Sequence, residues 1–178
     1  LYDPLTGQAG HVLLRERLTH MLDRLRRYRN DAFALLRVRV RGIGDAGRKY
    51  GYARADALRI QATERMARFA REGDTLTRIR GSEFALALEH AAGLEDGRLV
   101  ASRIVDAFSE SFPDEEGSDP AVKLNVAIGI LAGDPDIPDV DALMVLAEEA
   151  MDAADRCGFD HVAWVSPGTE DVVTAPPR

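Results

Sequence analysis

The chain of 178 residues has a single cysteine, few aromatic residues and no long apolar run. One cysteine, Cys157, excludes an internal disulfide and a zinc site built from cysteines, and it fits a reducing, cytoplasmic compartment. No apolar run approaches the ~18–20 residues that a membrane-spanning helix needs, so we expect no membrane contact by this segment. The four histidines show no spacing typical of metal ligands.

Acidic residues outnumber basic ones, and the formal net charge is −7. This balance argues against a protein that binds nucleic-acid polymers through general charge attraction. Hydrophobic residues make up 46% of the chain and charged residues 30%, which is typical of a globular domain. The length suits one α/β domain and is too short for two domains of ordinary size.

Apolar spacing predicts the order of the secondary-structure elements. Helical spacing predicts helices over 9–29, 42–50, 53–70, 95–112 and 139–156. Strand patterns occur at 32–40, 75–79, 84–88, 122–131 and 161–165. We therefore expect an α/β (α+β) domain over residues 1–165, with a central mixed five-stranded sheet surrounded by helices. Residues 166–178 contain three prolines and no apolar periodicity, which favours a linker or disordered tail.

The stretch from residue 71 to residue 88 carries the most specific pattern in the chain. Two alternating apolar runs, Thr75–Ile79 and Phe84–Leu88, flank the segment Arg80–Glu83. This spacing predicts a β-hairpin with a short turn. Gly81 supplies the positive φ angle that such a turn can require.

This stretch resembles the signature of the GGDEF, or diguanylate cyclase, family. In that family the turn reads Gly-Gly-Asp/Glu-Glu-Phe, and an Arg-x-x-Asp motif precedes it at a fixed distance. Arg71 and Asp74 stand at that distance. The turn departs from the family pattern and consists of Arg80, Gly81, Ser82, Glu83 and Phe84. The segment Asp3–Gly7 is similar to the Asp-x-Leu-Thr-Gly motif with which GGDEF domains often start, and the resemblance extends to about Val165.

The resemblance implies a site at which the family joins two GTP molecules into cyclic di-GMP, with carboxylates that hold metal ions. A gapless alignment places Arg39 and Arg41 at the positions of the strand carboxylates. Together with Arg37 they share one face of the strand, because strand side chains alternate. Cations at these positions would repel a divalent ion. We therefore expect no bound magnesium, no metal ligand and no catalytic residue.

Other positions that the family uses for GTP are also altered. The guanine-binding asparagine aligns with Gly47 and the phosphate-binding lysine with Asp155, while a further arginine and asparagine align with Phe159 and Asp160. Asp56 retains the residual guanine position. Together with the altered turn, these differences predict a catalytically inactive diguanylate cyclase homologue, not an enzyme.

The Arg71–Asp74 pair corresponds to the inhibitory product site, or I-site, of many family members. Arginine offers forked donors to a phosphate or to the edge of guanine, and aspartate accepts from guanine N–H groups. Arg98 and Arg103, on the next predicted helix, are candidates for a second contact with cyclic di-GMP. The alternative is an ordinary surface pair at a helix end, which contributes under ~1 kcal/mol.

The expected function is that of a cyclic di-GMP-sensing regulatory module in bacterial signalling. An alternative is a ligand-free interaction or dimerisation scaffold that regulates an attached phosphodiesterase (EAL) or sensor domain. A GTP-sensing domain is a third interpretation, weakened by the missing asparagine and lysine. The expected partners are cyclic di-GMP and other domains of the same chain or a signalling protein, and a homodimer stays open.

Overall fold

The computed structural model describes residues 1–158, 160–165 and 172–175. Along these residues the chain forms α1 (His11–Arg27), β1 (Ala34–Arg41), α2 (Ile43–Tyr50), α3 (Tyr52–Ala67), β2 (Thr75–Arg80), β3 (Glu83–Leu88), α4 (Leu94–Phe108), β4 (Asn125–Ala132), α5 (Val140–Cys157), β5 (His161–Val165) and β6 (Val172–Ala175). None of the described helices is long and apolar enough to cross a membrane. The predicted elements are present, with ends shifted by a few residues. The largest shift is in α4, which ends at Phe108 because Phe112 instead pairs with Val122 in an isolated antiparallel bridge.

The described strands form one mixed sheet in the order β2-β3-β1-β4-β5-β6. The central strand β1 pairs antiparallel with both β3 and β4, whereas β4 and β5 are parallel. This confirms the predicted mixed α/β fold. The sixth strand, β6, pairs with β5 and lies within the range predicted to be a linker or tail. Residues 166–171 and 176–178 of that range lie outside the described residues.

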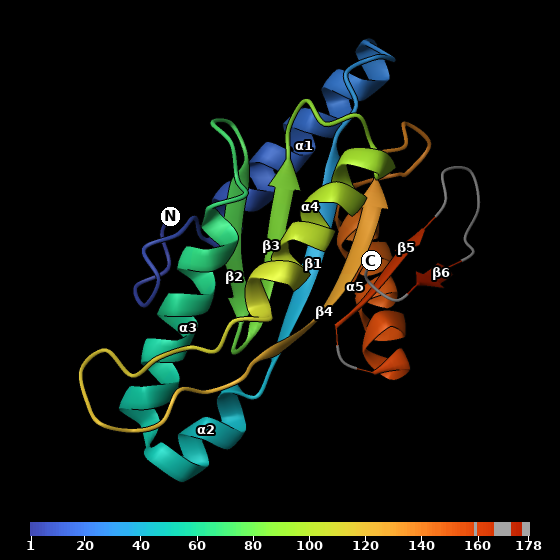
Figure 1. Cartoon of the computed structure of the whole chain (residues 1–178). Helices are drawn as coiled ribbons and strands as arrows, with labels where there is room; N and C mark the ends of the chain where they lie inside the picture. The colour runs from blue at the N-terminus through green and yellow to red at the C-terminus, as the bar shows by residue number, and fades with distance from the viewer. Residues whose placement is uncertain (159, 166–171, 176–178) are drawn as a thin grey trace.

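Helices cover both faces of this sheet, with α3 and α4 on one face and α1 and α5 on the other (Figure 1). Alternate residues of β1 point to opposite faces. Leu36 and Val38 pack on the α3–α4 side, and Leu35 packs on the α1–α5 side. Each such fully buried side chain contributes about 1.5–3 kcal/mol. The same alternation places Arg37, Arg39 and Arg41 on one shared face, as the sequence predicts, and the structure shows that this is the α1–α5 face.

The helix α5 lies directly on β4 because Gly129 has no side chain. A Cβ atom at this position would lie 2.2 Å from the backbone nitrogen of Met151 and 2.5 Å from the carbonyl oxygen of Ala147. Non-bonded carbon atoms pack at about 3.5–4.0 Å, so no other residue fits without moving the helix. This contact determines how closely α5 approaches the sheet.

The strands β2 and β3 confirm the predicted hairpin. They are joined by Gly81 and Ser82, and Gly81 has a φ angle of 50°. This is the left-handed region that glycine enters at little cost. The hairpin is also fixed to the start of the chain, since Asp3 accepts a hydrogen bond of 2.8 Å from Arg78 of β2 and another of 2.8 Å from the backbone of Thr6.

Candidate functional site

The face of β1 at which the sequence predicts the altered metal position holds a network of arginines and carboxylates. We call it the arginine–carboxylate network, and it consists of Arg37, Arg39, Arg41, Arg80, Glu83, Glu148, Asp152 and Asp155. The arginines come from β1 and the hairpin, and three of the four carboxylates come from α5. The network therefore joins segments that are more than 60 residues apart in the chain.

Glu83 is the shared acceptor on the hairpin side of the network. It stands opposite Arg39 in the pairing of β1 with β3, and the two side chains form an ion pair of 2.9 Å. Glu83 also lies 3.4 Å from Arg37 and 3.3 Å from Arg80. Its side chain is 15% exposed and that of Arg37 is 3% exposed. One partly buried carboxylate thus forms ion pairs with three guanidinium groups.

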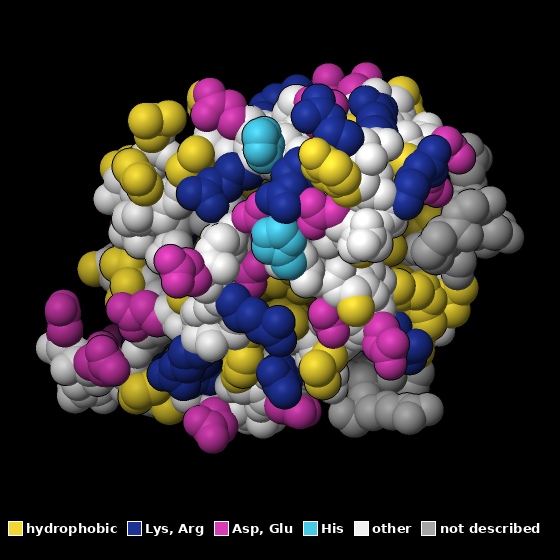
Figure 2. All heavy atoms as spheres, turned by 90° about the horizontal axis from the view of Figure 1, so that it is seen from above, with side chains coloured by type: hydrophobic (Ala, Val, Ile, Leu, Met, Phe, Trp, Pro, Cys, Tyr) yellow, Lys and Arg dark blue, Asp and Glu magenta, His cyan; other side chains and the backbone are white. Residues whose placement is uncertain are grey.

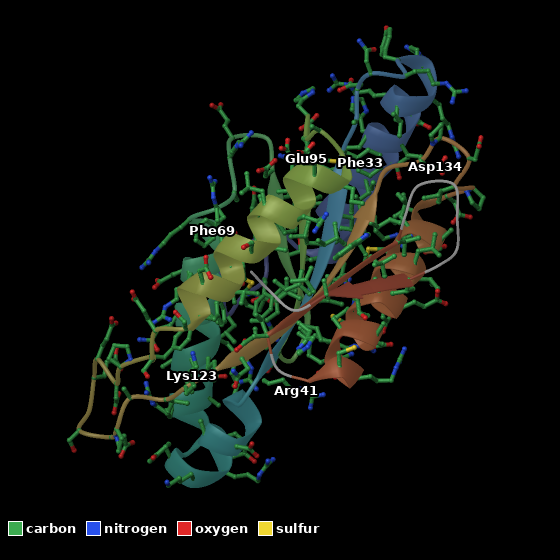
Figure 3. The ribbon with its side chains drawn as sticks, turned by 45° about the vertical axis from the view of Figure 1, so that its right-hand side comes forward. Phe33, Arg41, Phe69, Glu95, Lys123 and Asp134 are labelled. Carbon is green, nitrogen blue, oxygen red and sulfur yellow. The ribbon has the colours of Figure 1, made fainter. Side chains whose placement is uncertain are left out.

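The helix α5 supplies the other carboxylates. Arg39 forms ion pairs of 2.9 Å with Asp152 and 3.0 Å with Asp155. Arg41 donates to both carboxylate oxygens of Asp155, and it lies at the end of β1 close to the end of α5 (Figure 3). Glu148 completes the set through Arg80, at 3.1 Å. The C-terminal half of α5 is therefore bound to β1 through charged pairs.

These contacts shift the pKa values of the groups involved. Burial alone would lower the pKa of Arg39, but hydrogen bonds to Glu83, Asp155 and Asp152 outweigh it and raise that pKa above its ordinary value. Burial would raise the pKa of Glu83, but Arg39 and Arg80 lower it below its ordinary value. The pKa of Asp155 is lowered in the same way by Arg41 and Arg39. All three groups stay charged at neutral pH.

The network is electrically balanced, because four guanidinium groups face four carboxylates. Every carboxylate in it accepts from or lies beside an arginine, so the residues as arranged do not form a metal site. Within the described part of the chain, no group of three or more His, Cys, Asp or Glu side chains could hold a metal ion. The sequence identified Arg39 and Arg41 and named Asp155 only as an altered phosphate position, and it missed Glu148 and Asp152 and the role of all three carboxylates as partners of the arginines. Their spacing of four and three residues on one helix was a usable signal.

The predicted nucleotide positions are scattered rather than gathered in one pocket. A Cβ atom on Gly47 would lie 3.1 Å from the Cβ of Ala55, so α2 and α3 pack closely there. Asp56 is exposed and pairs with Arg59 at 2.8 Å. Asp160 accepts from the side chain of Asn125 at 2.9 Å and connects the start of β5 to β4. The position of Phe159 lies outside the described residues.

The Arg71–Asp74 pair lies in the loop between α3 and β2, which we call the 71–74 loop. Asp74 accepts hydrogen bonds from the backbone nitrogens of Arg71, at 2.7 Å, and Glu89, at 3.0 Å. Burial raises the pKa of Asp74, although both of these bonds oppose that shift. Asp74 therefore fixes the loop to the end of β3. The structure brings the two residues together through the backbone of Arg71 and not through its guanidinium group.

The guanidinium group of Arg71 is exposed and, among the described residues, has no hydrogen bond or ion pair. Figure 2 shows this end of the molecule, where basic side chains are interspersed with acidic ones. A small hollow of about 20 Å³ lies between the loop and α4, lined in part by Asp96 and Leu99. A nucleotide would lie on this surface and not inside it.

The two further arginines predicted for this site differ in position. Arg98 lies over the ring of Trp164 on β5, 4.3 Å from its centroid. Arg103 is exposed and follows Leu99 by four residues on α4, so both lie on the same side of that helix. The structure thus places Arg103 along the side of α4 that borders the 71–74 loop and directs Arg98 towards β5.

Comparison with known proteins agrees with this fold. The family description that matches residues 1–161 is "Diguanylate cyclase, GGDEF domain". The chain is 30% identical over 152 residues to MucR of Pseudomonas aeruginosa, a bifunctional diguanylate cyclase/cyclic di-GMP phosphodiesterase. The match covers 85% of this chain and 21% of MucR. Across the curated relatives it matches, this chain spans 20% to 35% of their length.

Two solved structures illustrate the likeness. The GGDEF domain of TpbB from P. aeruginosa is 26% identical and superposes with a TM-score of 0.81, over 89% of this chain and 91% of that one. The GGDEF domain of DgcB from Caulobacter crescentus, solved in complex with cyclic di-GMP, is 18% identical and also has a TM-score of 0.81, over 89% of each chain. The second likeness concerns the fold alone.

These findings overturn the prediction that the chain is not an enzyme. The matched family and the named relatives are diguanylate cyclases, and that prediction conflicts with them. One of its physical arguments, beside the altered turn and the missing asparagine and lysine, was that Arg39 and Arg41 repel metal where the family has carboxylates. In the structure both are neutralised by Glu83, Asp152 and Asp155, so the argument from charge repulsion fails. The fold, the hairpin, the Arg-x-x-Asp loop and the match over residues 1–161 together assign the chain to the diguanylate cyclase, or GGDEF domain, family.

Proposed function

We propose that this GGDEF domain, which belongs to cyclic di-GMP signalling, binds cyclic di-GMP at the 71–74 loop and acts as a regulatory sensor of that nucleotide. The observation that carries the proposal is the exposed guanidinium group of Arg71 on a loop that Asp74 fixes in place. An unpaired guanidinium on a fixed loop can bind an anion without first breaking an internal ion pair. The arginines of the arginine–carboxylate network lack this property.

The chemistry of the loop suits a cyclic dinucleotide. Arg71 can donate two parallel hydrogen bonds to a phosphate or to the O6 and N7 atoms of guanine. Each carboxylate oxygen of Asp74 accepts one backbone hydrogen bond and keeps acceptor capacity for guanine N–H groups. Arg103, on the side of α4 that borders the loop, is proposed to contact a second phosphate. Because the guanidinium groups supply the positive charge, this binding needs no magnesium.

The test is a calorimetric titration of the purified domain with cyclic di-GMP. Arg71→Ala should lower the affinity by about 10- to 100-fold, because a hydrogen bond to a charged group contributes about 1.5–3 kcal/mol. Arg103→Ala should have a smaller effect, and Arg98→Ala should have none. Arg156→Ala is the matched control, since Arg156 is exposed and lies on α5. Adding a chelator should leave the affinity unchanged.

Two results would contradict the proposal. Wild-type protein without measurable binding at high micromolar ligand would end the sensor proposal and favour a ligand-free scaffold. Binding that survives Arg71→Ala and is lost in Arg39→Ala would move the site to the arginine–carboxylate network. Titration with GTP in the same assay separates a cyclic di-GMP sensor from a GTP sensor.

A further inference from the structure

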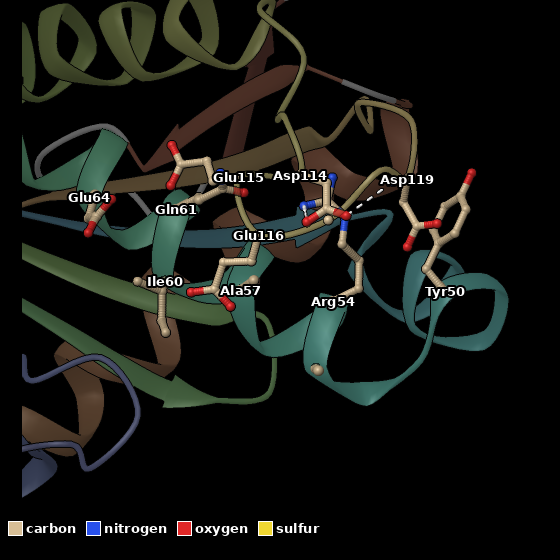
Figure 4. A pocket seen from close by; sticks show the side chains of 12 residues that line it. Tyr50, Arg54, Ala57, Ile60, Gln61, Glu64, Asp114, Glu115, Glu116 and Asp119 are labelled. Carbon is tan, nitrogen blue, oxygen red and sulfur yellow. Dashed lines mark hydrogen bonds and ion pairs between the residues drawn. The ribbon is translucent and has the colours of Figure 1, made fainter.

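Negative charge limits where an anionic nucleotide can bind on this domain. A cleft of about 310 Å³ between α3 and the loop of residues 113–120 is lined by several carboxylates (Figure 4), so charge excludes a nucleotide from it. The hollow beside the 71–74 loop also contains carboxylates, those of Asp74, Glu89 and Asp96, next to Arg71. Whatever offsets these charges affects how well the loop binds an anion.

Glu89 is the carboxylate of this hollow that packs against the loop from the end of β3. Its backbone nitrogen donates to Asp74 at 3.0 Å, and its Oε2 atom lies 3.3 Å from the position that a Cβ atom on Gly73 would take. Burial raises the pKa of Asp74, and the charge of Glu89 adds to that rise. The same charge opposes the binding of an anion at the loop.

On its other side, Glu89 belongs to a charged group that we call the His90 cluster, which consists of Arg24, Asp31, Glu89 and His90. Arg24 of α1 forms ion pairs of 2.7 Å with Asp31 and 3.0 Å with Glu89. The ring of His90 lies between the same two carboxylates, with Nδ1 3.0 Å from Asp31 and Nε2 3.7 Å from Glu89. In the described part of the chain, these three residues are the charged groups that face His90.

The charge of this cluster depends on whether His90 is protonated. A neutral imidazole ring has one N–H group and can donate to only one of the two carboxylates, whereas the protonated ring donates from both nitrogens. With a neutral ring, the one positive charge of Arg24 faces the two negative charges of Asp31 and Glu89. Protonation of the ring balances them. Histidine is the side chain whose charge ordinarily changes between pH 5 and 8, and His90 is exposed to solvent protons.

The backbone of His90 is a second and independent observation. Its φ angle is 54°, in the left-handed region that glycine favours and that few other residues adopt. Backbone strain of this kind persists where surrounding contacts hold it, and it is concentrated at sites with a function. His90 is therefore held beside Glu89 at a cost to the backbone, directly after the strand that Asp74 connects to the 71–74 loop.

We propose that protonation of His90 regulates the nucleotide site: it offsets the charge of Glu89 and strengthens the binding of cyclic di-GMP at the 71–74 loop as the pH falls from 8 to 6. This inference rests on the proposed function. The phosphodiester groups of the ligand stay charged over this range, so the change occurs in the protein. By linkage, the bound nucleotide also favours the protonated form of His90.

The experiment is a calorimetric titration of the full chain with cyclic di-GMP at pH 8, 7 and 6 and low ionic strength. The affinity of the wild type should be about threefold higher at pH 6 than at pH 8, and added salt should reduce this difference. His90→Gln should bind like the wild type at pH 8 and should lack the rise. His11→Gln is the matched control, because His11 is exposed and lies about 20 Å from Arg24 along α1. It should keep the rise.

A second pair of variants tests the role of Glu89. Glu89→Gln keeps the backbone bond to Asp74 and removes the charge, so it should bind more tightly than the wild type at pH 8 and show little further rise at pH 6. Glu116→Gln removes the same charge from the loop of residues 113–120 and should behave like the wild type. Circular dichroism confirms that the variants are folded.

Proton uptake on binding is an independent readout. Calorimetry at pH 7 in buffers of different ionisation enthalpy should show an uptake of about a quarter of a proton per site for the wild type, as a threefold linkage requires, and none for His90→Gln. Wild-type affinity that does not change with pH, or an equal rise in His90→Gln, would overturn this inference and leave the sensor proposal standing. Absence of binding at every pH would instead contradict the proposed function, and this inference with it.

Discussion

Two regions of the molecule use arginine differently. The arginines of the arginine–carboxylate network and Arg71 of the 71–74 loop differ in burial and in ion pairing. Arg37 and Arg39 are largely buried, and their charge is neutralised by carboxylates within hydrogen-bond distance. Arg71 is exposed, and among the described residues its guanidinium group has no such partner. The network uses its arginines to connect β1 with α5, whereas the loop leaves its arginine available for an outside anion. The number of arginines in a segment therefore does not measure the capacity of that segment to bind an anionic ligand.

The comparison predicts the largest loss of stability at Glu83. Glu83→Ala should lower the free energy of unfolding by about 3–5 kcal/mol, because it leaves the buried charges of Arg37 and Arg39 without their shared partner. Urea denaturation followed by circular dichroism measures this loss. Glu149→Ala, on the exposed side of α5, is the control and should change stability by less than about 0.5 kcal/mol. If Glu83→Ala lowers the free energy of unfolding no more than Glu149→Ala does, the network does not stabilise the fold.

A second, smaller effect is expected where Asp3 binds Arg78. Burial raises the pKa of Asp3, but the bonds from Arg78 and Thr6 outweigh it and lower the pKa to about 2, from an ordinary 3.8. Because the folded-state pKa is depressed, the stabilisation is fully present above about pH 4 and is lost as the pH falls towards 2. It should amount to about 2 kcal/mol.

The measurement is the pH dependence of the unfolding free energy for the wild type and Asp3→Asn. The variant should be less stable at neutral pH, and the difference should shrink as the pH falls from 4 to 2. A difference that stays constant over this range would mean that the contribution of Asp3 does not depend on its charge. Asp141→Asn, which removes an exposed ion pair with Arg15, is the matched control and should change the unfolding free energy at neutral pH by less than about 0.5 kcal/mol.

The outer edge of the network should show a still smaller coupling. The side chain of Arg41 is 49% exposed and that of Asp155 is 13% exposed, so water screens this pair more than the pair of Arg39 and Glu83. A double-mutant cycle with Arg41→Ala and Asp155→Ala should give a coupling energy of about 1 kcal/mol that decreases with salt. A coupling that is independent of salt would place this pair with the buried part of the network.

The smallest expected effect on stability belongs to Arg71. Arg71→Ala should change the unfolding free energy by less than about 0.5 kcal/mol, because its guanidinium group has no internal bond to lose. The same chemical denaturation measures it, alongside the nucleotide titration. A loss above about 1 kcal/mol would contradict the contrast between the two regions and would show that Arg71 has a structural role.

The sequence was sufficient for features that depend on local spacing. Alternation predicted the β2–β3 hairpin and the shared face of Arg37, Arg39 and Arg41, since both follow from a period of two residues. The sequence was not sufficient to predict that carboxylates neutralise the positive charge of that face. The neutralising residues Asp152 and Asp155 are more than 100 residues away, and the closeness of α5 to the sheet depends on tertiary packing.

Other differences have equally specific physical causes. Asp74 was predicted to face a ligand with Arg71, but its carboxylate also holds the backbone of Glu89, 15 residues away, which no local pattern reveals. The strand β6 was missed because Val172 and Val173 are both exposed and lie between prolines, so they show no apolar alternation. Arg54 is buried by a loop that follows it by almost 60 residues, and its hydrogen bonds to that loop are visible only in the folded chain.

The absence of a side chain at Gly129 has a mechanical consequence for the charged end of α5. The backbone of α5 touches the sheet at Ala147 and Met151, and Asp155 lies four residues beyond, about 6 Å farther along the helix axis. This contact therefore sets the tilt of α5 relative to the sheet. The ion pairs with Arg39 and Arg41 lie beyond it, towards the C-terminal end of the helix, so a change in tilt moves them. One methyl group added at Gly129 would tilt the helix and separate Asp155 from Arg39 and Arg41, although the methyl group contacts none of them. In this way a single missing carbon atom sets the geometry of an electrostatic contact elsewhere on the sheet.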